Sequence, residues 1–124
     1  VKNNLDCGQF TAVQDAAIAA LSGDQQCVAD LCALYQHRRD VVVEALRAIG
    51  LECNTPKATI YVWAKVPAGE TSASFATKLL EQAHVIVTPG SGYGPDGEGY
   101  IRISLTTPDD RLLEAARRIK EAMA

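Results

Sequence analysis

A glycine-rich loop that runs directly into a two-faced strand constrains this chain most. Five glycines and two prolines fall between Pro89 and Gly99, too many for a helix or for the interior of a regular strand. The next residues, Tyr100-Ile101-Arg102-Ile103-Ser104-Leu105, alternate apolar and polar and predict a strand with Arg102 on its polar face. Because a planar guanidinium can bind a carboxylate or a phosphate through two hydrogen bonds, this pattern indicates an anion-binding position.

Arg102 also has a purely structural interpretation, which the residues alone leave open. In that interpretation it pairs with Glu98 or with a carboxylate on a neighbouring strand. The adjacent loop favours a ligand, because glycines allow backbone to approach it closely. Tyr93 and Tyr100 could line the resulting cleft, although tyrosines half-buried in a sheet are common.

The remaining segments predict the fold class. Helical periodicity predicts helices over residues 9–21, 25–49, 71–83 and 108–122, and other patterns predict strands over 51–54, 59–66 and 85–87. This order lacks the regular alternation of strand and helix that is typical of parallel sheets. We therefore predict an α+β domain: a small, mostly antiparallel sheet of three or four strands with helices packed on one face, preceded by a long interdomain-type helix.

The same patterns predict which side chains are buried. The long helix is expected to bury a stripe that includes Val28 and Leu31, and the last helix is expected to bury Leu112 and Leu113. Arg38 is expected on a solvated face, and Gly50 as a left-handed helix cap. We interpret Tyr61 and Trp63, which share one strand face, as core or domain-interface packing.

Composition excludes several classes of function. The 124 residues predict one domain, and the net charge of −3 disfavours binding to nucleic acid or to an anionic membrane. No apolar run approaches the roughly 20 residues that cross a bilayer, and no signal peptide is recognisable, so a cytoplasmic location is expected. Four cysteines without C-x-x-C spacing predict reduced thiols and no metal site.

Two short motifs match by letters but not by context. Gly92-x-Gly94-x-x-Gly97 matches the dinucleotide fingerprint, which requires a strand before it and a helix after it; here a strand follows. Gly94-Pro95-Asp96-Gly97 matches the loop of an RNA-binding KH domain, but Asp96 and Glu98 would repel the RNA backbone. Taken alone, the residues predict an anion-binding α+β module rather than a complete catalyst.

Four motifs in order give a resemblance to a known family. They are Asn3-x-x-Asp6-Cys7-Gly8-x-Phe10, Tyr61-Val62-Trp63-Ala64, Thr88-Pro89-Gly90-x-x-x-Gly94 and Gly97-Glu98-Gly99-Tyr100-Ile101-Arg102-Ile103-Ser104-Leu105. Together they resemble the C-terminal small domain of a class I/II, fold-type I aminotransferase that uses pyridoxal 5'-phosphate (PLP). The aspartate and LL-diaminopimelate aminotransferase-like subgroup is the most similar.

The resemblance implies roles for individual residues. Arg102 would bind the substrate α-carboxylate, and Tyr93 would lie near the substrate. Asn3, Cys7 and Gly8 would lie near the dimer interface and the substrate side-chain pocket of the neighbouring subunit. Relatives usually have serine in place of Cys7 and often phenylalanine in place of Tyr93. Residues 1–24 would form the edge of the large PLP-binding domain and a dimer-interface segment, and residues 25–124 the small domain.

The resemblance also implies what lies elsewhere. The Schiff-base lysine and the residues that hold PLP are expected upstream of Val1, so the chain is expected to be a fragment of an enzyme that transfers an amino group between an L-amino acid and a 2-oxo acid. Alone it is expected to contain no catalytic residue, to bind no PLP and to be inactive. Its expected partners are the amino acid or 2-oxo acid, the large domain of the same polypeptide and a second copy in a homodimer. The alternative is a free-standing module that binds small carboxylates or metabolites without catalysis.

Overall fold

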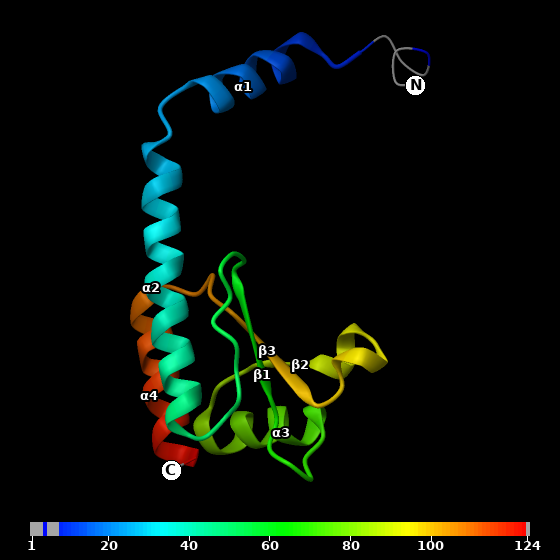
Figure 1. Cartoon of the computed structure of the whole chain (residues 1–124), viewed down its shortest axis with the longest axis vertical. Coiled ribbons are helices and arrows are strands. Elements are labelled where there is room, and N and C mark those ends of the chain that lie inside the picture. Colours follow the sequence, from blue (N-terminus) through cyan, green and yellow to red (C-terminus); the bar gives the residue numbers. More distant parts are fainter. Residues whose placement is uncertain (1–3, 5–7, 124) are drawn as a thin grey trace. The chain divides into compact units, whose positions relative to one another are not determined.

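The computed structural model describes residue 4 and residues 8–123, and it divides into two compact units, Val1–Ala33 and Leu34–Ala124 (Figure 1). The boundary falls inside helix α2 (Gln26–Ala48), which follows helix α1 (Thr11–Ser22). Both helices lie where the sequence predicted them. No residue of α1 is buried. The predicted buried stripe of the long helix is wrong at Val28 and Leu31, which are exposed; α2 buries side chains only near its C-terminal end, where it joins the core of the second unit.

The second unit is built on a three-stranded antiparallel sheet in the order β1-β3-β2. After α2 come β1 (Tyr61–Lys65), α3 (Ser72–Lys78) with its π-helical extension η2 (Leu79–Ala83), β2 (Thr88–Pro89), the 3-10 turns η3 (Gly90–Tyr93) and η4 (Pro95–Gly97), β3 (Tyr100–Ser104) and α4 (Asp109–Met123) (Figure 1). The predicted α+β class is confirmed. Near residues 51–54 the structure has a single antiparallel bridge, between Cys53 and Ala64.

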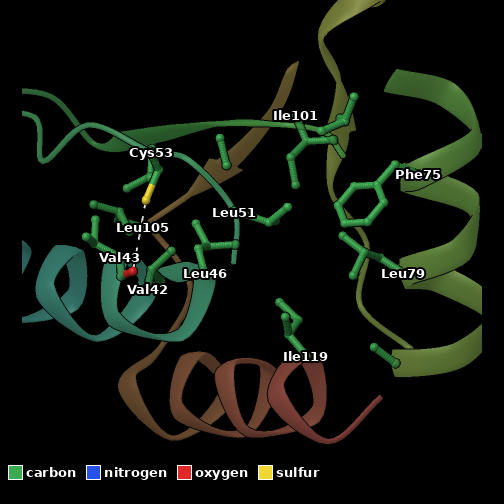
Figure 2. Packing of buried hydrophobic residues seen from close by; sticks show 14 of the residues in the cluster. Val42, Val43, Leu46, Leu51, Cys53, Phe75, Leu79, Ile101, Leu105 and Ile119 are labelled. Carbon is green, nitrogen blue, oxygen red and sulfur yellow. Dashed lines mark hydrogen bonds between the residues drawn. The ribbon is translucent and has the colours of Figure 1, made fainter. Parts of the chain in front are cut away.

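One face of the sheet forms the core together with the helices. Val62, Ala64 and Ile101 point to this side and are fully buried, as the alternation along their strands requires. Figure 2 shows these strands packed against side chains from α2, α3, η2 and α4. The core side chains drawn there with labels are Val42, Val43, Leu46, Leu51, Cys53, Phe75, Leu79, Ile101, Leu105 and Ile119. The opposite face of the sheet therefore remains available for polar and aromatic groups.

Local sequence signals fix two helix ends as predicted. Gly50 ends α2 with a φ of +79°; its N–H donates to the Arg47 carbonyl and the Leu51 N–H donates to the Leu46 carbonyl, which is a Schellman motif. Thr71 caps α3: its side chain accepts the Ser74 N–H, and the Ser74 hydroxyl accepts the Thr71 N–H.

The predicted strand over residues 85–87 is wrong. His84 ends η2 in the left-handed conformation, with a φ of +54°, and the chain runs as a loop until Thr88. Only Thr88 and Pro89 reach the register of β3, opposite Arg102 and Ile101. Val85 and Val87 still pack against the core from this loop, which explains why their apolar character resembled a strand.

The solvated position predicted for Arg38 is also wrong. Its side chain is 12% exposed, and its Nε donates to Asp109 Oδ1 at the start of α4. Its Nη1 donates to the Leu105 carbonyl at 3.1 Å. These bonds connect α2 to the end of β3 and to α4, over separations in sequence that a local pattern does not record.

Helix α4 tests the burial pattern directly. It buries Leu112, Ala116 and Ile119, whereas Leu113, also predicted to be buried, is 50% exposed. We expect Leu112→Ala to lower the free energy of unfolding by about 2–5 kcal/mol, because it leaves a cavity in the core. The matched variant Leu113→Ala should cost less than about 1 kcal/mol. Urea denaturation measures both, and equal losses would contradict this assignment of the buried face.

Candidate functional site

The outer face of the sheet carries the candidate site. Antiparallel register places Trp63 of β1 directly opposite Arg102 of β3, and Thr88 of β2 opposite Arg102 on the other side. Because strand residues alternate between faces, Tyr61 lies on the same side as Trp63. Arg102 therefore stands on the central strand, with a neighbouring strand on either side, which limits the movement of its backbone.

Two tyrosine rings contact the Arg102 guanidinium. Its Cζ lies 4.0 Å from the ring centroid of Tyr61 and 4.3 Å from that of Tyr93, both within the range of a cation–π interaction. Tyr93 also meets Trp63 edge to face, with centroids 5.5 Å apart and planes inclined by 70°. We call Arg102, Tyr61, Trp63 and Tyr93 the aromatic–arginine cluster. Its rings orient the guanidinium without neutralising it.

The cluster contains an unsatisfied donor. Arg102 Nε is buried and has no hydrogen-bond partner within the described part of the chain. A buried donor without an acceptor costs about 1–3 kcal/mol, and more when it is charged. The structural interpretation of Arg102 is wrong for Glu98: both oxygens of that carboxylate bind Ser72 instead. The arrangement can therefore accept a planar anion from outside the described residues.

Polar contacts connect the glycine-rich loop to the start of α3. Glu98 Oε1 accepts the Ser72 N–H at 2.7 Å, and Oε2 accepts the Ser72 hydroxyl at 2.8 Å. Ser72 Oγ lies 3.0 Å from Ser91 Oγ and accepts the Ser91 N–H at 3.3 Å. The Ser72 N–H, then its hydroxyl and the Gly99 N–H, hold the pKa of Glu98 below its ordinary value of 4.5.

Two glycines close the loop on itself. A Cβ built on Gly97 would lie 2.1 Å from the Gly90 carbonyl oxygen, and one built on Gly90 would lie 1.9 Å from the Gly97 carbonyl oxygen. Neither distance is possible for a real side chain, so both positions require glycine. At Gly92 a Cβ would meet nothing within 4 Å. The glycine content of the loop thus serves a close backbone crossing as well as its turns.

The structure brings together only some of the predicted site residues. Tyr93 contacts Arg102, as the cleft interpretation expected. Asn3 and Cys7 lie outside the described residues, and Gly8, exposed with a φ of +95°, belongs to the first unit. Their predicted place near the substrate stays a prediction.

Sequence reasoning missed the other two aromatic members of the cluster. We predicted that Tyr61 and Trp63 pack in the core or at a domain interface. The core alternative is wrong, because both lie on the outer face of the sheet and Trp63 is 39% exposed; packing at a domain interface stays a prediction. The alternation along β1 places them together. Only the pairing register with β3 places Trp63 opposite Arg102, and no local pattern supplies that register.

Comparison with known proteins establishes the family. The family described as aminotransferase class I and II matches residues 5–119, so the chain belongs to this family. It is 60% identical over 111 residues to an LL-diaminopimelate aminotransferase of Dehalococcoides mccartyi, covering 90% of this chain and 29% of that protein. It is 52% identical over 123 residues to the LL-diaminopimelate aminotransferase of Moorella thermoacetica, covering 99% of this chain and 32% of that protein.

A solved structure agrees with these relatives. The probable N-succinyldiaminopimelate aminotransferase of Thermus thermophilus superimposes with a TM-score of 0.80 at 36% identity, covering 98% of this chain and 32% of that one. The chain thus spans about 30% of the length of the relatives that it matches. None of the helices described in it is both long and apolar enough to span a membrane.

The family implies PLP in its full-length members, and the lysines described here do not fit that cofactor. A Schiff-base lysine is activated by a desolvated pocket or by a neighbouring cation. Lys65, Lys78 and Lys120 instead form ion pairs near the surface, with Glu52, Glu70 and Glu44 respectively. Lys57 is exposed. None of these four lysines is therefore assigned as the Schiff-base residue.

The close backbone contact between Gly90 and Gly97 predicts different effects of substitution at Gly97 and Gly92. We expect Gly97→Ala to displace the loop, because the new methyl group would overlap backbone, and to lower the free energy of unfolding by about 1–3 kcal/mol. Gly92→Ala should leave stability nearly unchanged. Thermal unfolding measures the first effect, and the NMR resonance of the Arg102 Nε–H reports displacement of Tyr93. A Gly97→Ala protein with the native resonance and stability would contradict the predicted closure.

The hydrogen bonds of Glu98 predict its titration. Because the pKa of this carboxyl is lowered in the folded protein, its charged form stabilises the fold above pH 4.5, and that contribution is lost as the pH falls through the lowered value. Ser72→Ala removes the hydroxyl donor and keeps the N–H, so the pKa of Glu98 should rise toward 4.5. Carbon-13 NMR titration of the Glu98 carboxyl measures this. Ser74→Ala, at the same helix end, should leave the pKa of Glu98 unchanged.

Proposed function

We propose that this chain is the C-terminal part of a PLP-dependent aminotransferase, and that Arg102 binds the α-carboxylate of the amino acid or 2-oxo acid. In this proposal residues 25–124 form the small domain, and residues 1–24 belong to the edge of the large domain and to a dimer interface. The family match and the relatives of about three times this length support it.

The observation that carries the proposal is the uncompensated charge of Arg102. Its buried Nε lacks a partner in the described chain, and the groups stacked on the guanidinium are neutral rings. A carboxylate has two oxygens at the spacing of the two N–H groups along one edge of a guanidinium. Binding one would satisfy the buried donor and the charge together, without breaking an existing ion pair.

The contribution of this chain to the reaction is orientation. The central strand fixes the Arg102 backbone, and Tyr61 and Tyr93 fix the plane of the guanidinium. A carboxylate held on two points has a defined position and rotation, which converts binding energy into alignment of the reacting carbon. PLP would supply the electron sink for amino transfer, and we propose that residues outside this chain hold it.

The remaining parts of the proposal concern surroundings and partners. We propose that the full-length enzyme is a homodimer and that Tyr93 lies near the substrate. We place Asn3, Cys7 and Gly8 near the dimer interface and the substrate side-chain pocket of the neighbouring subunit. A cytoplasmic location fits the free thiols of Cys27, Cys32 and Cys53. The alternative, a free-standing carboxylate-binding module, uses the same Arg102 site, but the match to much longer aminotransferases does not favour it.

Substitution of Arg102 tests the proposal in the enzyme that contains this chain. We expect Arg102→Ala to lower kcat/KM by about 100-fold or more, since a two-point charged contact in a desolvated site is worth several kcal/mol. Arg102→Lys should recover little of the loss, because an ammonium group cannot form the planar pair.

The control is Arg111→Ala, which removes an exposed arginine of α4 and should leave kcat/KM within about twofold of wild type. Steady-state kinetics with an amino acid and a 2-oxo acid measures all three variants. An Arg102→Ala enzyme with wild-type kcat/KM would refute the role of Arg102.

A further inference from the structure

We propose that Glu98 and Ser72 are positioning residues: their contact holds the loop over residues 90–99 so that Tyr93 stays against Arg102. The effect of this contact on carboxylate binding rests on the proposed function, because that function makes the Arg102 guanidinium the binding group. The contact itself is defined by hydrogen bonds and stands independently of that function.

The loop needs such a contact because it has almost no apolar anchor. In η3 only Gly90 is buried, and no residue of η4 is. Tyr93, the large side chain of η3, is 48% exposed. Five glycines also increase the conformational entropy that the loop loses when it becomes ordered. The small apolar area that the loop buries does not compensate for this loss. Polar contacts have to supply the order.

Ser72 provides an anchor because it lies in a buried position next to the core. It is fully buried, and it begins α3, whose Phe75 and neighbouring Leu79 belong to the core (Figure 2). Its N–H and hydroxyl both bind Glu98, and its Oγ also accepts the Ser91 N–H. A negative carboxylate at the first turn of a helix is favourable, because the free N–H groups point toward it. The helix thereby binds both ends of the loop.

The contacts of Ser72 with the loop restrain the surroundings of Arg102 through only a few intervening residues. Ser91 and Tyr93 share the single turn of η3, so fixing Ser91 limits the movement of the Tyr93 ring. That ring lies 4.3 Å from Arg102 Cζ and edge to face with Trp63. On the other side of the loop, Glu98 is followed after Gly99 by β3, which carries Arg102. Releasing Glu98 should therefore loosen Tyr93 while the core beneath the sheet remains intact.

The 124-residue chain offers a direct probe, because Trp63 is its single tryptophan. We expect Glu98→Gln to raise acrylamide quenching of Trp63 fluorescence about twofold, because the Tyr93 ring no longer shields the indole. The matched control is Ser74→Ala, which removes the hydroxyl that accepts the Thr71 N–H at the same helix end without touching Glu98, and should leave quenching at the wild-type value. Unchanged quenching in a folded Glu98→Gln protein would overturn the proposal.

A second variant covers the case in which Glu98→Gln fails to fold. Ser91→Ala removes the hydroxyl that faces Ser72 and keeps every contact of Glu98, so it should increase quenching in the same direction by a smaller factor. Native far-UV circular dichroism with wild-type quenching in this variant would also count against the proposal.

A separate readout distinguishes this inference from the proposed function. Titration with sodium acetate, followed at the Arg102 Nε–H resonance, should give binding that is about three- to tenfold weaker in Glu98→Gln than in wild type, because the guanidinium is less ordered before binding. If acetate does not perturb this resonance in the wild type, the proposed carboxylate binding by Arg102 is refuted. The quenching experiment then still tests whether Glu98 and Ser72 position Tyr93. Equal acetate affinity despite increased quenching would show that the loop does not act through Arg102, and would refute the inference.

Discussion

Strand β3 is hydrogen-bonded on both edges, to β1 on one side and to β2 on the other, and its two faces have opposite chemistry. Ile101 of β3 and Leu105, which follows the strand directly, are fully buried against the helices. Arg102, one residue further than Ile101, stands on the outer face. Burial of the apolar face, at roughly 25 cal/mol per Å², fixes the orientation of the strand. The direction in which Arg102 points is thus a consequence of core packing.

The outer face accepts a charge that it does not neutralise. Two tyrosine rings lie about 4 Å from the Arg102 guanidinium, yet its buried Nε has no acceptor among the described residues. Such a group raises the free energy of the ligand-free protein, and the carboxylate binding that we propose would remove that penalty. A preorganised donor also loses little conformational entropy on binding. In our proposal, local instability at this position and affinity for an anion therefore have the same physical cause.

The glycine-rich loop solves a related geometrical problem. It must place Tyr93 beside Arg102 while its own ends cross so closely that Gly90 and Gly97 exclude any side chain. Glycine permits the crossing but leaves the loop with little to bury. The hydrogen bonds from Ser72 to Glu98 compensate by tying the loop to a helix whose Phe75 belongs to the core.

The sequence by itself determined the features that depend on neighbours along the chain: the order of most helices and strands, the helix caps, the family motifs and the alternation that separates Ile101 from Arg102. It erred at Leu113, because apolar character does not say which neighbour is near. Tertiary structure decided the contacts between segments far apart in sequence, such as that of Glu98 with Ser72. For a group such as the Glu98 carboxylate, the sequence offers several possible partners of suitable chemistry. Packing of the core selects among them, because the strand register and the placement of the helices decide which polar groups come within hydrogen-bonding distance.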